Sequence, residues 1–168
     1  YRAGVDDPLT QQGSAGQPAP DGQRLAKAFR LAAYITELDG NTIELAVGHV
    51  AHELEQRLRG QCFAHITAWN PGGVTRGDAE NAAADLELCR LIDSHRLVRV
   101  PMGSSAPDGE WWEPGWLVLD VSRVTLDEWA HHFGQSGTLW WQRGQPVHLR
   151  MYVPNPQLGS DIYTDWIE

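Results

Sequence analysis

Polar side chains that could bind or transform a ligand occur at four points where the chain is expected to enter or leave a strand or helix. They are Asn70, Asn81, Glu113 and Gln135. Side-chain amides donate and accept hydrogen bonds but take little part in proton transfer, so Glu113 is the one ionisable candidate and the candidate catalytic residue. Such a set favours recognition of a small molecule over demanding catalysis.

Asn70 follows the apolar run QCFAHITAW, which suits a strand covered on both faces, and it precedes Pro71. Proline disfavours helical geometry in the residue before it, so Asn70 is expected to be extended. Gly72 and Gly73 allow positive φ angles and close approach of the backbone to a ligand. A loop of this kind at the end of a central strand can bind a ligand, or Asn70 can hydrogen-bond its own turn.

Asn81 lies three residues before Ala84 and seven before Leu88, so helical periodicity predicts that it lies on a buried stripe. A buried amide needs hydrogen-bond partners, which a ligand or the backbone of the 70–77 loop could supply. Gln135 follows a predicted helix. It can point towards the same corner as Asn81, or it can bond a helix end or a sheet edge.

Glu113 stands between Trp112 and Pro114 in a segment that also contains Trp111 and Trp116. A glutamate buried among these rings could act as a general base or accept a hydrogen bond from a ligand amine. An exposed glutamate would be a charge on the rim of the site. The sequence leaves both interpretations open.

Histidine and cysteine patterns point to no metal site. His49, His52 and the following Glu53 lack the HExxH spacing of zinc proteases, so a solvated helix start is favoured. Cys62 and Cys89 fall in apolar patterns, which favours two buried thiols over a disulfide or a metal site. His65 is interpreted as a core histidine with satisfied hydrogen bonds.

Four ordered motifs resemble a known family. They are FAHITAWNPGG, Asn81 in GDAEN, Trp112-Glu113-Pro114 and Phe133-Gly134-Gln135. Their order is similar to that of the bacterial domain-of-unknown-function family 3293, and the similarity extends over about residues 24–150. The resemblance implies that the family's polar positions are Thr67, Asn70, Asn81, Glu113 and Gln135. It implies no activity, cofactor or substrate.

Composition limits the classes of function. The 168 residues, 42% of them hydrophobic, suffice for one core, and no apolar run is long enough to span a bilayer. Thirteen basic and 22 acidic residues give a net charge of −9, which disfavours nucleic-acid binding. A soluble, cytoplasmic protein without membrane contact is expected, although a mimic of nucleic acid would carry the same charge.

The pattern along the chain predicts a flexible tail over residues 1–20, one α/β domain over residues 21–153 and an acidic extension over residues 154–168. Helices are expected after Asp21, up to Gly60, from Asp78 to Arg96, and after a capping box that starts at Thr125. Hairpins are expected at Asp39-Gly40 and Arg143-Gly144, with residues 61–69 as the central strand. The predicted class is α+β or mixed α/β, a single mixed sheet with a hairpin at each end and about four helices.

The function predicted from these features is binding of a small-molecule or nucleotide-like ligand. Thr67, Asn70, Asn81 and Gln135 would bind the ligand, with Glu113 as the catalytic candidate. The alternative is an acidic protein-interaction module, including one that mimics nucleic acid towards a basic partner. Tryptophans around the polar corner would favour the first function, and tryptophans spread over an outer face would favour the second.

Overall fold

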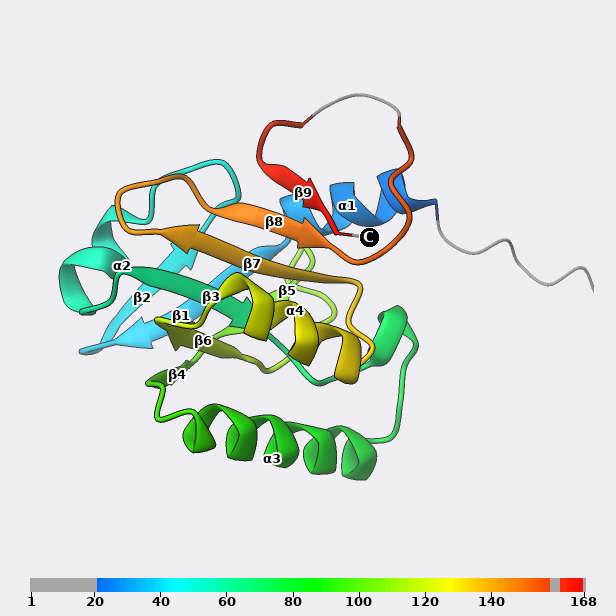
Figure 1. The fold of residues 1–168 in the computed structure, drawn as a ribbon, viewed down its shortest axis with the longest axis horizontal. Coiled ribbons are helices and arrows are strands. Elements are labelled where there is room, and N and C mark those ends of the chain that lie inside the picture. Colours follow the sequence, from blue (N-terminus) through cyan, green and yellow to red (C-terminus); the bar gives the residue numbers. More distant parts are fainter. Residues whose placement is uncertain (1–20, 158–160, 168) are drawn as a thin grey trace, which may run out of the picture.

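The computed structural model describes residues 21–157 and 161–167. The predicted tail over residues 1–20 therefore lies outside the described residues. The described residues form four α-helices: α1 (Gly22–Leu31), α2 (His52–Arg57), α3 (Asp78–Ser94) and α4 (Arg123–His132) (Figure 1). None of these helices is both long and apolar enough to cross a bilayer.

The strands divide between two sheets. They are β1 (Ala33–Leu38), β2 (Asn41–Leu45), β3 (Cys62–Ile66), β4 (Arg99–Pro101), β5 (Gly103–Ser105), β6 (Trp116–Leu119), β7 (Gly137–Gln142), β8 (His148–Met151) and β9 (Thr164–Trp166). One sheet has the order β2-β1-β5 and the other β4-β6-β3-β7-β8-β9. All pairs are antiparallel except β8 with β9. The α+β class is confirmed, with the predicted sheet split in two.

The split occurs at Met102, the one residue between β4 and β5. Met102 is buried, and the chain crosses there from the large sheet to the small one. The hydroxyl of Thr36 on β1 donates to the carbonyl of Pro101 at 2.7 Å, so the two sheets are also joined by a side chain. Apolar periodicity does not distinguish one long strand from two short ones on either side of such a crossing.

Both predicted hairpins are confirmed. β1 and β2 are joined at Asp39 and Gly40, whose φ angles of 51° and 75° are those of a tight two-residue turn. β7 and β8 pair on either side of the turn that contains Arg143 and Gly144. β3 lies between β6 and β7, as expected for a central strand, and it ends at Ile66.

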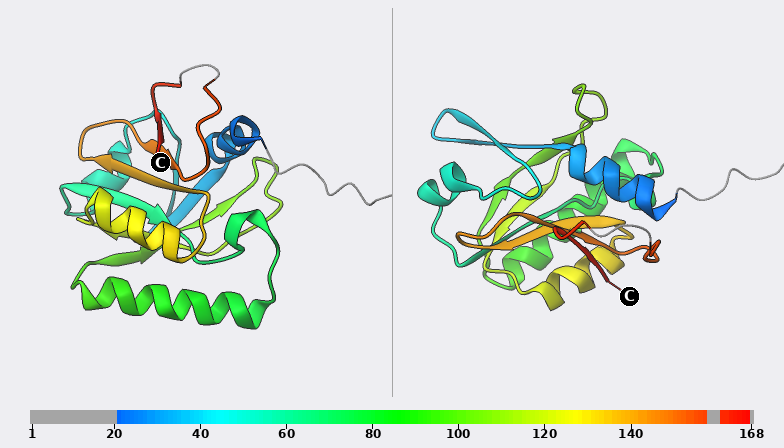
Figure 2. Two further views of the ribbon diagram at one scale, coloured as in Figure 1. Left: turned by 45° about the vertical axis from the view of Figure 1, so that its right-hand side comes forward. Right: turned by 90° about the horizontal axis from the view of Figure 1, so that it is seen from above.

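Apolar clusters cover both faces of the large sheet. Helices α3 and α4 pack on one face, where Leu88 and Ile92 are fully buried with Trp129. The small sheet, α1 and α2 lie on the opposite face, as the two views of Figure 2 show. The polar loops between β3 and α3 and between α4 and β7 emerge at the same end of this three-layer arrangement.

Helix starts differ from those predicted. Helix α4 begins after Ser122, whose hydroxyl accepts from the Thr125 amide at 3.1 Å, and not after Thr125. Ser122 offers the same kind of cap three residues earlier and adds almost a turn to the helix. Helix α3 has Gly77 at its N-cap, with Asp78 as the first helical residue. The Asp21 cap of α1 is confirmed.

Part of the predicted C-terminal extension belongs to the large sheet. Strand β9 pairs with β8, Thr164 is buried, and Trp166 packs against the core. Asp161, just before β9, forms an ion pair with Arg30 of α1 at 3.1 Å. The end of the chain thereby supports both the sheet and the first helix.

Candidate functional site

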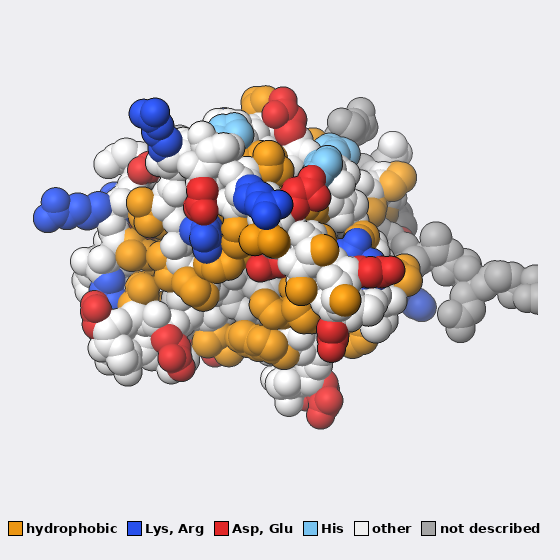
Figure 3. All heavy atoms as spheres, turned by 90° about the horizontal axis from the view of Figure 1, so that it is seen from below, with side chains coloured by type: hydrophobic (Ala, Val, Ile, Leu, Met, Phe, Trp, Pro, Cys, Tyr) orange, Lys and Arg blue, Asp and Glu red, His pale blue; other side chains and the backbone are white. Residues whose placement is uncertain are grey.

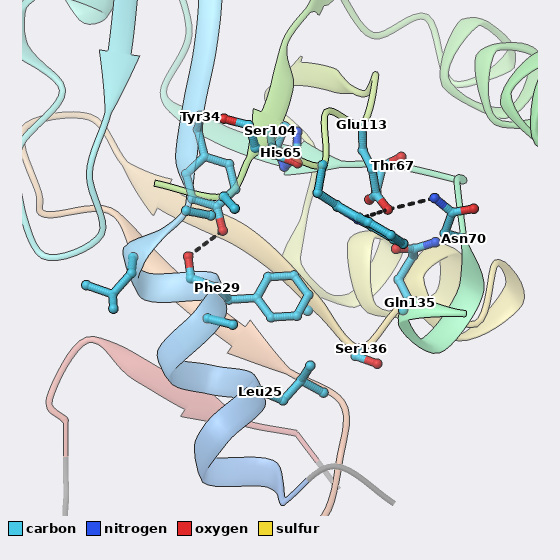
Figure 4. Close-up of a pocket in the computed structure, with 18 of the residues that line it drawn as sticks. Leu25, Phe29, Tyr34, His65, Thr67, Asn70, Ser104, Glu113, Gln135 and Ser136 are labelled. Carbon is cyan, nitrogen blue, oxygen red and sulfur yellow. Dashed lines mark hydrogen bonds between the residues drawn. The ribbon is translucent and has the colours of Figure 1, made fainter. Parts of the chain in front are cut away.

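A cavity of about 320 Å³ lies between α1, the small sheet and the loops that follow β3 and α4. Leu25 and Phe29 of α1 line its apolar side (Figure 4). The opposite side carries Thr67, Asn70, Glu113 and Gln135, which we call the polar corner. Four of the five residues predicted as site residues thus line one cavity.

The members of the polar corner come from three separate segments held together by hydrogen bonds. The Asn70 amide donates to Oε1 of Glu113 at 2.9 Å. The Thr67 hydroxyl donates to the Pro114 carbonyl at 2.7 Å, and the Gln135 amide donates to the Trp69 carbonyl at 2.9 Å. The corner is therefore formed by the protein alone, before any ligand binds.

Asn70 adopts a left-handed conformation, with φ 45° and ψ 65°, and not the extended one predicted from Pro71. Proline disfavours the right-handed helical region but leaves the left-handed one open, and asparagine tolerates that region well. The conformation is stabilised because the Asn70 side-chain oxygen accepts from the Arg76 amide at 3.0 Å. Gly72 and Gly73 also have positive φ, as expected.

Asn81 lies behind Asn70 and is not among the residues that line the cavity. Its side chain is 1% exposed. Its oxygen accepts from the Asn70 backbone N–H at 3.0 Å, while its amide donates to the Asn70 side-chain oxygen and to the Arg76 carbonyl. The geometry is that of a residue that fixes the 70–77 loop, the structural alternative considered from the sequence.

Glu113 is half-buried at the cavity wall and held from two directions. Its backbone exchanges two hydrogen bonds with Ser104 at the edge of β5. Its Oε1 accepts from Asn70 and from the indole N–H of Trp111, both at 2.9 Å. Within the described residues, Oε2 accepts no hydrogen bond and the carboxylate has no basic partner.

His65 also lines the cavity, a role that the core interpretation of the sequence missed. Its Nε2 lies 3.1 Å from the Met102 carbonyl and must carry the proton, because a carbonyl only accepts. Burial lowers the pKa of His65 to about 4, so the ring is neutral at physiological pH. The signal in the sequence was alternation, since His65 and Thr67 lie two residues apart on one strand face.

Tyr34 of β1 also lines the cavity and was not among the site residues predicted from the sequence. Its hydroxyl donates to the Phe29 carbonyl at 2.6 Å, and burial raises the pKa of Tyr34 well above its usual value. The ring packs edge-on against His65, with centroids 5.2 Å apart. Tyr34 therefore stays protonated and joins α1 to the cavity wall.

Metal ligation and thiol chemistry gain no support in the described part of the chain. It contains no group of three His, Cys, Asp or Glu side chains that could hold a metal ion. Cys62 and Cys89 are free thiols, and burial raises the pKa of both, which makes them poor nucleophiles. The negative charge of Asp120 further raises the pKa of Cys62, and a backbone hydrogen bond from Asp120 opposes this rise.

The tryptophans are distributed over core and surface. Trp111 lines the cavity, and it and Trp112 are each 53% exposed on the loop beside it. Trp129 and Trp141 are buried in the two apolar clusters. Viewed from the side of α3, the surface carries hydrophobic side chains interspersed with charges of both signs (Figure 3).

Comparison with known proteins gives one match. A family described as a protein of unknown function (DUF3293) matches residues 66–137. Neither the curated proteins nor the solved structures include a significant match. The matched segment contains all five predicted site residues and runs from the end of β3 to the start of β7. Over residues 66–137, the segment that builds the polar corner, the chain is therefore similar to the DUF3293 family.

Proposed function

We propose that the cavity binds a small molecule with an apolar body, whose polar group contacts the polar corner. The observation that carries this proposal is the cavity itself, which joins an apolar wall from α1 to Thr67, Asn70, Glu113 and Gln135. Binding sites for small molecules are typically concave and largely apolar, with a few convergent polar groups. A volume of about 320 Å³ lies at the small end of that class.

Preorganisation supports binding. Asn81 and Arg76 hold Asn70 in its left-handed conformation, and Asn70 in turn orients Glu113. A ligand that meets side chains already in place loses less of its affinity to the ordering of those side chains. The stabilised corner therefore favours recognition, with Glu113 as the one group suited to act as a general base if a reaction follows.

The residues that line the cavity restrict which part of the nucleotide-like ligand expected from the sequence could bind. No lysine or arginine lines the cavity within the described residues, and Glu113 is an anion. A phosphate group would meet repulsion and no compensating charge. The base-like part of such a ligand fits this lining better than a phosphate does.

The test uses 2-phenylethanol, a neutral probe with an aromatic ring and one polar group, observed by ligand NMR. We expect weak but saturable binding, with a Kd on the order of 1 mM for so small a molecule. Ala28→Phe fills the cavity mouth from an exposed position of α1 and should abolish binding. Ala83→Phe, at an exposed position of α3 away from the cavity, is the matched control. Equal binding by both variants would contradict the proposal.

A further inference from the structure

Several hydrogen-bond donors in the cavity wall are bonded within the protein, whereas several acceptors are not. This difference indicates which class of ligand the cavity favours. The donors on His65, Thr67, Tyr34 and Gln135 are committed to the protein. The Nε2–H of His65 and the hydroxyls of Thr67 and Tyr34 all donate to backbone carbonyls. The Gln135 amide must point its NH₂ towards the carbonyls of Trp69 and Phe133, because two carbonyls cannot bond to its oxygen.

Three acceptors remain. They are Oε2 of Glu113, Oε1 of Gln135 and Nδ1 of His65, each without a hydrogen-bond partner in the described part of the chain. Every buried side-chain nitrogen or oxygen that the structure describes does have a partner, so these three atoms are accessible. Gln135 and His65 are 8% and 4% exposed, and the cavity that they line is where these atoms can meet a ligand.

The charge of the cavity has one sign. Among the described residues that line it, Glu113 is the only carboxylate, and none is a lysine or arginine that could neutralise it. His65 does not compete as a cation, because burial lowers its pKa by more than the hydrogen bond to the Met102 carbonyl raises it, which favours the neutral ring. The serine hydroxyls of Ser104, Ser105 and Ser136 can donate or accept, so they adapt to either kind of ligand.

We infer that the ligand of the proposed site is a cation that donates hydrogen bonds, an ammonium or amidinium group on an apolar body. Its charged group lies at Oε2 of Glu113, with Oε1 of Gln135 and Nδ1 of His65 as further acceptors. Its apolar body lies against Leu25 and Phe29 of α1. The inference rests on the proposed function and specifies the ligand that the same cavity takes.

The experiment compares three probes of one skeleton by ligand NMR at pH 7. They are 2-phenylethylamine, which is a cation, 2-phenylethanol, which is neutral, and phenylacetate, which is an anion. We expect the amine to bind about tenfold more tightly than the alcohol, since charge-assisted hydrogen bonds are roughly twice as strong as neutral ones. Phenylacetate should bind more weakly than the alcohol.

Glu113→Gln keeps the shape of the side chain and removes its charge. It should weaken binding of the amine much more than binding of the alcohol, so that the preference for the amine over the alcohol is lost. Glu110→Gln is the matched control, because Glu110 is exposed on the same loop and does not line the cavity. It should keep the preference for the amine, which separates a local contact from the attraction of a protein with net charge −9.

The outcomes separate the two proposals. If the unmodified protein binds alcohol and amine equally, the cationic ligand is ruled out and the cavity remains a binding site. If Glu110→Gln reduces the preference as much as Glu113→Gln does, the preference is a long-range effect of charge and the inference is again overturned. If none of the three probes binds, the proposed function fails, and the inference fails with it.

Discussion

Asn70 and Asn81 act as one unit, because each supplies hydrogen-bond partners to the other. Asn81 satisfies the backbone N–H of Asn70, and their side chains share a further bond of 3.0 Å. Both are buried, so solvent cannot replace these bonds. The polar corner depends on Asn81 even though that residue does not line the cavity.

Replacing Asn81 with leucine should therefore destabilise the ligand-free protein. The Asn70 N–H and the Arg76 carbonyl would lose a buried partner, which typically costs about 1–3 kcal/mol of unfolding free energy. The thermal midpoint should fall by roughly 2–4 °C per kcal/mol at this chain length. Ala82→Leu, at the next and exposed position of α3, should change little. An unchanged or raised midpoint would show that the amide is retained for a ligand and not for the loop.

His65 makes the stability of the folded protein depend on pH. Burial lowers its pKa to about 4 in the folded state, against about 6.5 in an unfolded chain. Below pH 6.5 the unfolded chain binds the proton and the folded protein does not, so stability falls as the pH falls towards 4. The stabilising effect of the neutral ring is complete only above about pH 6.5.

Denaturant unfolding at pH 7 and pH 5 tests this dependence. The unmodified protein should lose about 2 kcal/mol more unfolding free energy over that interval than His65→Gln, which cannot take up a proton. Subtracting the change in unfolding free energy measured for the variant removes the contributions of the other titrating groups. An equal loss in both proteins would mean that His65 titrates normally and is not held neutral by the cavity.

At the level of elements, the sequence predicted best where the local pattern is decisive. The buried face of α4, with Leu126, Trp129 and Phe133, follows from helical spacing. The hairpin at Asp39-Gly40 follows from the positive φ angles that these residues accept. Both features are set by residues within a few positions of one another.

Boundaries and long-range pairings were less predictable. Ser122 and Thr125 offer equivalent caps, and the start at Ser122 places Arg123 over the ring of Trp140 on β7, a long-range contact that the local pattern does not reveal. Strand β9 has three residues and pairs in parallel with β8, so no turn links the two in sequence. The conformation of Asn70 was mispredicted because Asn81, eleven residues away, stabilises it.

For the whole molecule, the polar half of the site was visible in the sequence and the apolar half was not. Thr67, Asn70, Glu113 and Gln135 belong to recognisable motifs. Leu25 and Phe29 look like ordinary core residues of an amphipathic helix, and only tertiary packing leaves part of that face open as a cavity wall. The cavity exists because the strands form two separate sheets, and the apolar pattern of the sequence did not reveal that they do.

The position of α1 depends on the end of the chain, which leads to a prediction for the molecule as a whole. Arg30 of α1 pairs with Asp161 and donates to the hydroxyl of Thr164, while Trp166 packs against the apolar cluster beneath α1. Deleting residues 158–168 removes these contacts together with β9. Full burial of one large side chain stabilises a fold by about 1.5–3 kcal/mol, and Trp166 is partly buried while Thr164 is buried, so the deletion should cost on the order of 2 kcal/mol.

The same deletion should weaken binding of 2-phenylethanol, because it loosens the helix that supplies the apolar wall of the cavity. Asp161→Asn keeps β9 and Trp166 but removes the ion pair with Arg30, whose two side chains are each 28% exposed, and weakens the hydrogen bond from the Thr164 hydroxyl to the same oxygen. It should cost less than about 1 kcal/mol, and binding should persist. Urea unfolding and ligand NMR on both proteins distinguish the two effects. If the shortened chain unfolds at the same urea concentration and binds as before, residues 158–168 are a surface extension, and the contacts of Arg30 do not position α1.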